Sequence, residues 1–223
     1  MAAWLAMGFL ASAARAQVPP SAAEAARYIG LLAAAHKGDL PQLKKLLAAG
    51  ASVNERDSHG RTAVHVAAFA RQRDVLRALA QAGANLELLE NDRYDAVTVA
   101  AVADDEETLR VLLALGASAK QTTSRYDGTA LIAAAHLGHD GVVRQLIAAG
   151  APLDHVNNLH WTAVIEAIVL GNGGARHQAV LRGLLEAGAS TRLTDREGNT
   201  PLTLARARGY VTMVAMLEKA AAK

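Results

Sequence analysis

The side chains best able to do chemistry are eight histidines, one acidic run and one isolated glutamate. His136 and His139 could share a helix face, but the other histidines are scattered and lack an obvious carboxylate partner, whereas a zinc site needs three or four ligands together. The acidic run Asp104-Asp105-Glu106-Glu107 opens a helical stretch, where carboxylates cap backbone N–H groups and favour the helix dipole. The sequence therefore predicts no metal site and no cofactor.

Glu166 occupies a helical position that is usually apolar, and no second acid lies near it, so it forms no acid–base pair. The chain contains no H-E-x-x-H, G-x-S-x-G, Walker or G-x-G-x-x-G motif. The run Gly171-Asn172-Gly173-Gly174 does not follow a strand, as a phosphate-binding turn of the Rossmann type would. With no catalytic residue to name, we expect a protein that is not an enzyme.

Composition narrows the class of protein further. Of the 223 residues, 52% are hydrophobic and 20% are charged, which is far from the composition of a disordered chain. Lys and Arg number 23 against 21 Asp and Glu, so no basic surface points to nucleic acid. The absence of cysteine excludes disulfides, cysteine-bound zinc and thiol catalysis.

The first sixteen residues have the pattern of a signal peptide. A short apolar stretch is followed by Ala14-Arg15-Ala16, an A-x-A cleavage site, so we expect residues 1–16 to be removed and 17–22 to form a linker. The alternative, a first helix of the fold, is disfavoured because the segment has no polar face and Pro19-Pro20 follows it. Export without cysteine favours a periplasmic or secreted bacterial protein with no membrane anchor after cleavage.

The remainder of the chain is one unit repeated. Gly-Ala pairs begin at residues 50, 83, 116, 150 and 188, a period of 33 or 34 that lengthens to 38 in the fifth unit. Each pair ends an apolar helical run, and about a dozen residues later a shorter alanine-rich run opens with Thr62, Thr129 or Thr162. The pattern predicts helix, tight turn, helix and polar hairpin, with a five-residue insertion between the two helices of the fifth unit.

These units resemble the ankyrin repeat, whose pattern runs D-x-x-G-x-T-P-L-H-x-A-A. The closest matches are Asp57-Ser58-His59-Gly60-Arg61-Thr62-Ala63-Val64-His65 and Asp195-Arg196-Glu197-Gly198-Asn199-Thr200-Pro201-Leu202. The resemblance implies an all-α ankyrin solenoid over residues 23–223, with about six helix-turn-helix repeats joined by short β-hairpins or loops. The repeats are expected at about 24–56, 57–89, 90–123, 124–156, 157–194 and 195–223.

The resemblance also implies particular roles for single residues. His65 and His139 occupy family positions where histidine is structural. In the third repeat Asp95 stands where threonine usually starts the helix, and it can cap that helix instead. This repeat is expected to be the weakest in the stack.

The resemblance implies a non-enzymatic, monomeric module that binds an unidentified protein partner. In this family the partner meets the hairpin tips and the exposed face of the first helices. We expect four aromatic residues along one concave surface, Phe69, Tyr94, Tyr126 and Trp161, and a rim of Arg61, Arg125, Asn158, Leu159 and Arg196. Exposed Tyr and Trp are typical binding hot spots.

Two alternatives remain open for these aromatic residues. Each could simply pack on its neighbouring hairpin. The groove could also bind a small molecule or a peptide fragment with the help of Glu166. An open groove favours a protein partner, whereas an enclosed pocket of several hundred Å³ favours a small ligand.

Overall fold

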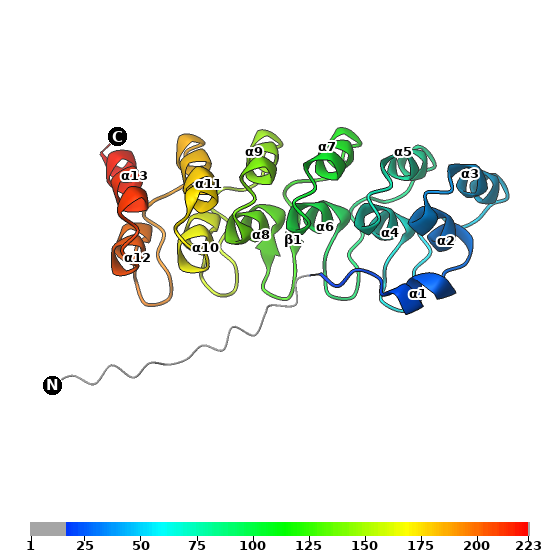
Figure 1. The fold of residues 1–223 in the computed structure, drawn as a ribbon, viewed down its shortest axis with the longest axis horizontal. Coiled ribbons are helices and arrows are strands. Elements are labelled where there is room, and N and C mark those ends of the chain that lie inside the picture. The colour runs from blue at the N-terminus through cyan, green and yellow to red at the C-terminus, as the bar shows by residue number, and fades with distance from the viewer. Residues whose placement is uncertain (1–16, 223) are drawn as a thin grey trace.

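The computed structural model describes residues 17–222, so the predicted signal peptide lies outside the described residues. Within them, six helix pairs stack side by side into an elongated solenoid (Figure 1). The pairs are α2 (Gly30–Lys37) with α3 (Leu40–Ala48), α4 (Ala63–Phe69) with α5 (Arg73–Gln81), α6 (Ala96–Val102) with α7 (Glu106–Ala114), α8 (Ala130–Leu137) with α9 (Asp140–Ala148), α10 (Ala163–Val169) with α11 (Ala175–Glu186), and α12 (Pro201–Ala207) with α13 (Val211–Ala221). The prediction of six repeats in an all-α solenoid is confirmed.

The first helix of most repeats begins at the predicted polar residue. The hydroxyls of Thr129, Thr162 and Thr200 accept hydrogen bonds from the backbone N–H three residues later. Asp95 does the same for α6, where its Oδ1 lies 2.7 Å from the Thr98 nitrogen. The predicted cap in the third repeat is therefore confirmed.

The core is a row of alanines between adjacent first helices, backed by leucines of the second helices. Ala67, Ala100, Ala134 and Ala167 occupy the same position in α4, α6, α8 and α10 and are at most 1% exposed. Small side chains let these helices approach closely, and no repeat can cover its own apolar faces alone. Stability therefore comes from the interfaces between neighbouring repeats.

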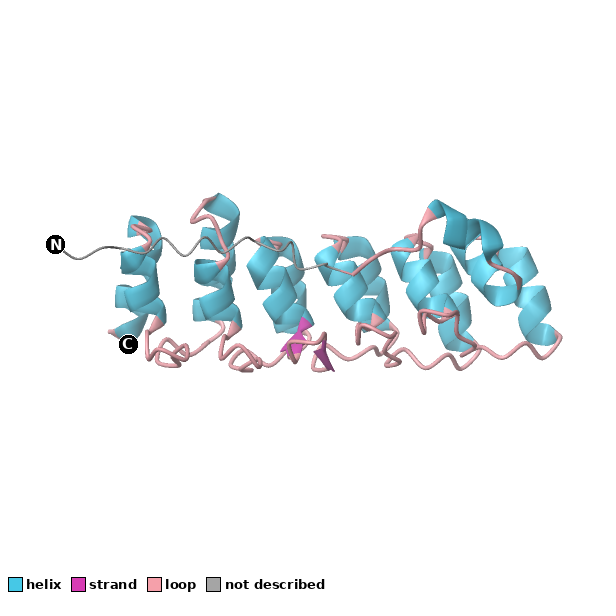
Figure 2. Cartoon of the chain, turned by 90° about the horizontal axis from the view of Figure 1, so that it is seen from below, coloured by secondary structure: helices cyan, strands magenta, loops and turns pink. Residues whose placement is uncertain are grey.

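Hairpins project from the first helices in one row (Figure 2). Only one of them, in the described part of the chain, contains a β-ladder, with β1 (Thr122–Thr123) antiparallel to β2 (Gly128–Thr129). The other hairpins are held by a side chain at their base, as at Asp57, Asn157 and Asp195, whose Oδ1 atoms accept two backbone hydrogen bonds each. A row of hairpins with a common geometry gives the solenoid one continuous edge.

The insertion in the fifth repeat lies where the sequence predicts it, but part of it is helical. Helix α11 has 12 residues, whereas α3, α5, α7 and α9 have 9 each. The extra turn places His177 Nε2 2.9 Å from the carbonyl of His136 and Arg176 2.7 Å from Asp104. Arg176 thus reaches past the fourth repeat to the third. No helix among residues 17–222 is both long enough and apolar enough to span a bilayer.

Candidate functional site

An N-terminal strap (residues 17–29) covers the hairpin face of the second repeat, which the sequence did not predict. The strap contains α1 (Ala22–Arg27), whose start is fixed by reciprocal hydrogen bonds between Ser21 and Glu24. Arg61 donates hydrogen bonds to the Val18 carbonyl at 3.0 Å and to Glu24 at 3.3 Å. Part of the predicted linker is therefore docked on the repeats.

Arg61 is consequently not the exposed rim residue that the sequence suggested. It is only 4% exposed, because the strap lies over it. The expectation failed because the covering groups come from a segment about forty residues earlier in the chain. Its guanidinium already forms hydrogen bonds with the strap.

Further contacts hold the strap to the first two repeats. The Tyr28 hydroxyl donates to Asp57 at 2.9 Å, and its ring meets the edge of His36 with centroids 6.2 Å apart. Glu24 also lies 2.6 Å from His59 Nε2. Hydrogen bonds from Ser21, helped by the charges of Arg61 and His59, lower the pKa of Glu24 to about 2. The chain thus shows that this face accepts a short helix whose side chains complement the hairpin.

The four predicted aromatic residues do not form one strip, because they occupy three different positions within their repeats. Phe69 is the last residue of α4, Tyr94 and Trp161 precede α6 and α10 by two residues, and Tyr126 lies at a hairpin tip. Tyr126 is 38% exposed, whereas the other three are half-buried and Phe69 packs against the core. Burial raises the pKa of Tyr94. Phe69 therefore fits the alternative of a packed aromatic residue better than it fits an exposed binding strip.

The other predicted rim residues lie on the hairpins, where several hold adjacent tips together. The Asn158 side chain donates to the Arg125 carbonyl at 2.9 Å, and the Arg196 guanidinium donates to the Asn158 carbonyl. Arg125 is exposed and lies 6.0 Å from the centre of the Tyr126 ring, while Leu159 is half-buried. These side chains form a connected edge on repeats four to six.

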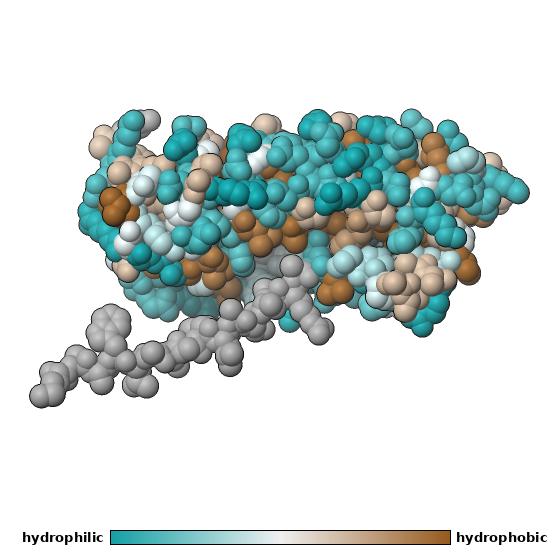
Figure 3. All heavy atoms as spheres, in the orientation of Figure 1, coloured by the Kyte–Doolittle hydropathy of each residue, from teal (hydrophilic) through white to brown (hydrophobic). Residues whose placement is uncertain are grey.

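At their C-terminal ends, the first helices of repeats four and five present exposed leucines. Leu137 ends α8 and Leu170 follows α10 directly, and they are 37% and 45% exposed. Figure 3 shows hydrophobic side chains gathered along the level of the first helices, below the more hydrophilic second helices. We call Leu137, Val169 and Leu170 the open face. Sequence reasoning missed the two leucines because it followed aromatic residues and hairpin-tip residues, not the last position of the first helices.

Glu166 lies beneath the open face with two polar neighbours. Its Oε1 accepts a hydrogen bond of 3.0 Å from the Asn157 amide, and its Oε2 lies 3.4 Å from Nδ1 of His136. The carboxylate is buried, and Oε2 has no hydrogen-bond donor among the described residues. Comparing the repeats position by position would have revealed Asn157, which stands where the second and last repeats carry aspartate.

The remaining histidines and acids that the sequence singled out have structural roles. Nδ1 of His65 lies 2.9 Å from the Thr62 hydroxyl, and His139 lies 2.9 Å from the Ala101 carbonyl of the preceding repeat. Asp105 caps α7 through the Thr108 nitrogen, as expected for the acidic run. Among residues 17–222 no three metal-ligating side chains cluster.

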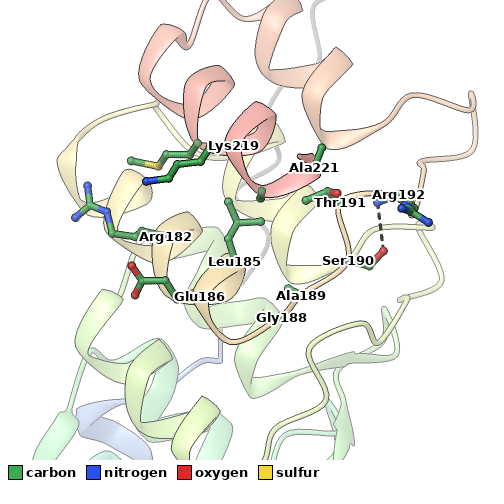
Figure 4. Close-up of a pocket in the computed structure, with 12 residues that line it drawn as sticks. Arg182, Leu185, Glu186, Gly188, Ala189, Ser190, Thr191, Arg192, Lys219 and Ala221 are labelled. Carbon is green, nitrogen blue, oxygen red and sulfur yellow. Dashed lines mark hydrogen bonds between the residues drawn. The ribbon is translucent and has the colours of Figure 1, made fainter. Parts of the chain in front are cut away.

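A pocket of about 640 Å³ lies between α11 and α13, on the second helices (Figure 4). It is lined by Leu185, Thr191 and Met216 among others, and none of the nine predicted binding residues borders it. Arg182 and Arg192 lie at opposite sides of the pocket and do not converge on a common point. This pocket therefore gives no support to a small ligand in the groove of the first helices.

Helix pairs that stack along one axis and present a row of hairpins define a repeat solenoid. A family model described as ankyrin repeats in three copies matches residues 31–123, and an ankyrin repeat model matches residues 126–158. The ankyrin repeat protein YahD of Escherichia coli (strain K12) is 36% identical over 192 residues, which cover 86% of this chain and 95% of that protein. The chain belongs to the ankyrin repeat family.

Solved structures agree with this assignment. The crystal structure of an ankyrin repeat domain from Acinetobacter baumannii AYE has a TM-score of 0.81 and 41% identity, covering 86% of this chain and 97% of that one. A chain from the Bdellovibrio bacteriovorus complex of the endopeptidase Bd0816 with the immunity protein Bd3460 has the same fold, with a TM-score of 0.71 and 24% identity over 86% of this chain and 98% of that one. Ankyrin repeats generally mediate protein–protein interactions and are typically not enzymes.

Proposed function

We propose that this protein is a non-enzymatic module whose open face, with the hairpin edge of repeats four to six, binds a protein partner. The observation that carries the proposal is the exposure of Leu137 and Leu170 at equivalent positions of adjacent repeats. The solenoid does not need leucine there, because the same position holds Ala70 after α4 and Ala103 after α6. Adjacent exposed apolar side chains bordered by polar residues mark interaction surfaces.

The arrangement favours a protein over a small molecule. The exposed leucines, Tyr126 and the hairpin edge extend over neighbouring repeats instead of enclosing a cavity. Partner recognition at such a surface concentrates in a few central apolar and aromatic side chains. Leu137 and Leu170 fit that role, and the half-buried Trp161 adds to the hairpin edge, from which α10 starts. Arg125, Asn158 and Arg196 supply the polar edge.

The test compares a double variant, Leu137→Ser with Leu170→Ser, with the control Val211→Ser. Val211 is 79% exposed on α13, away from the open face. Burying a large aliphatic side chain is worth about 1.5–3 kcal/mol, so the double variant should lose at least about tenfold in affinity. Quantitative capture from extracts of the native host measures this loss. A partner retained by the double variant, or lost equally with Val211→Ser, would refute the open face.

We also propose that the protein is exported through cleavage after Ala16 and acts as a monomer in the periplasm or outside the cell. The support is the sequence of residues 1–16 and the lack of cysteine. Mass spectrometry of the protein from its native host should find Gln17 at the N-terminus. Retention of Met1 would contradict export, and a dimer in light scattering would contradict the monomer.

A further inference from the structure

Repeat five departs from repeats two, three and six at two positions together. At the hairpin base it has Asn157, where repeats two, three and six have Asp57, Glu90 and Asp195. Nine residues later it has Glu166, where those repeats have valine or leucine. The two changes are complementary, because the Asn157 amide donates to the Glu166 carboxylate at 3.0 Å. An aspartate at the hairpin base would instead place two carboxylates together.

The Asn157–Glu166 hydrogen bond leaves the second oxygen of a buried carboxylate, Oε2, without a hydrogen-bond partner. Glu166 is 4% exposed, and no donor in the described part of the chain forms a hydrogen bond with its Oε2. His136 Nδ1 is close, at 3.4 Å, but outside hydrogen-bonding geometry. Buried polar groups in native proteins nearly always have a partner, so an exception calls for a reason. The fold supplies none, because the equivalent residues of the other repeats are apolar.

The carboxylate lies directly under the open face. Glu166, Val169 and Leu170 are spaced i, i+3 and i+4, so they share one side of α10. His136 and Leu137 border them from α8, and the His136 side chain is 36% exposed. This partly exposed imidazole lies beside Oε2, 3.4 Å away. Helices α4, α6, α8 and α10 contain no Lys or Arg, and Glu166 is the only acidic residue in them.

We propose that Glu166 is a recognition site for a cationic side chain of the protein partner, an arginine or lysine flanked by apolar residues. This inference rests on the proposed function of the open face. The incoming guanidinium or ammonium displaces His136 and donates to Oε2, while Asn157 keeps Oε1 in place. Leu137 and Leu170 contact the apolar residues on either side of the cation. A charge-assisted hydrogen bond in a water-poor site is a strong specificity contact.

The strap provides a counterpart with the charges reversed. In repeat two the hairpin presents Arg61, and the strap brings Glu24 to it. Repeat five has Trp161 at the position of Arg61 and an acid nearby, so the complementary segment carries a cation. The strap on Arg61 is thus the precedent, within this chain, for a segment that would pair its cation with Glu166.

The experiment follows the Asn157 side-chain amide by NMR in the full-length protein. The probe is n-butylguanidinium, up to about 20 mM, and the matched neutral probe is n-butylurea, which has the same shape without the charge. We expect a saturable shift of the Asn157 amide with n-butylguanidinium and a response at least about tenfold weaker with n-butylurea. Glu166→Gln should abolish the difference between the probes. Glu55→Gln, which removes an exposed charge in the first hairpin, should preserve it.

Equal responses to the two probes, or a charge preference that persists in Glu166→Gln, would overturn the proposal. Thermal unfolding of Glu166→Gln shows whether the variant is folded, and its melting temperature should not fall. The cation experiment needs no partner, so it fails independently of the proposed function. A partner that is lost on serine substitution of the leucines but bound equally by Glu166→Gln would keep the open face and refute the cation site.

Discussion

Asp95 offers a sharp test of the energetics of the stack, because it is a helix cap buried in the core. It is 2% exposed, and burial raises its pKa from 3.8 to about 6 despite the hydrogen bonds from Thr98. A carboxyl group with a raised folded-state pKa holds its proton in the folded protein after the unfolded chain has released it. Its contribution to stability is therefore greatest below pH 3.8 and is lost as the pH rises to about 6. At about 1.4 kcal/mol per pKa unit, the loss amounts to about 3 kcal/mol.

The substitution Asp95→Asn keeps a side-chain carbonyl for the Thr98 nitrogen and removes the charge. We expect the variant and the wild type to have similar free energies of unfolding near pH 4. At pH 7.5 the variant should be more stable, by up to about 3 kcal/mol. Urea denaturation followed by circular dichroism at both pH values measures the difference. Burial lowers the pKa of His65 to about 4, which gives an opposite slope between pH 4 and 6.5, so the difference between variant and wild type is the quantity to measure.

Asp105→Asn is the matched control, because Asp105 is also a buried helix cap. Its pKa is lowered, since hydrogen bonds from Thr108 and Arg73 outweigh the effect of burial. Removing this charge should therefore destabilise the protein at pH 7.5, and the loss should shrink at acidic pH. If Asp95→Asn also destabilises at pH 7.5, or if its effect does not depend on pH, the reasoning from burial is wrong.

Three further predictions concern packing, the strap and the insertion. Ala100→Leu should overpack the interface between first helices and cost about 1–3 kcal/mol in urea denaturation, whereas Ala103→Leu, at an exposed position, should cost little; equal costs would contradict the assigned helix faces. Arg61→Leu should release the strap, so that chymotrypsin cleaves after Tyr28 faster than in the wild type, and an unchanged rate would refute the anchor. Arg176→Ala should lower the free energy of unfolding by no more than about 1 kcal/mol, because its ion pairs are exposed to solvent, and a larger loss would show that repeats three and five are coupled directly.

The features that the sequence predicted correctly are those fixed by local or periodic patterns. The Gly-Ala spacing gave the repeats, and Asp95 and the threonines gave the starts of the first helices. His65 and His139 were predicted to be structural because their positions recur in every unit of the family pattern. Because the interfaces between neighbouring repeats stabilise such an array, the sequence pattern of one repeat predicts how the next repeat packs.

The features that the sequence did not predict depend on contacts outside the period. The burial of Arg61 comes from Val18 and Glu24, which belong to no repeat. Residue type alone also did not predict how the aromatic residues lie, because aromatic residues at different repeat positions do not align in space. Comparison at a fixed position would have paired Leu137 with Leu170, and it would have separated Phe69 from Tyr94.

Repeats two and five follow the same physical rule, although different segments pair with their charged side chains. Outer positions of the first helices and hairpins are free of the packing that holds the repeats together, so their residues can vary without loss of the fold. In repeat two these positions carry Arg61, and the chain's own strap buries it against Glu24. In repeat five Leu170 occupies such a position, and the Oε2 of Glu166 beneath it has no hydrogen-bond donor in the described chain. A segment that brings a cation to this carboxylate would complete in repeat five the kind of charge pair that the strap completes in repeat two.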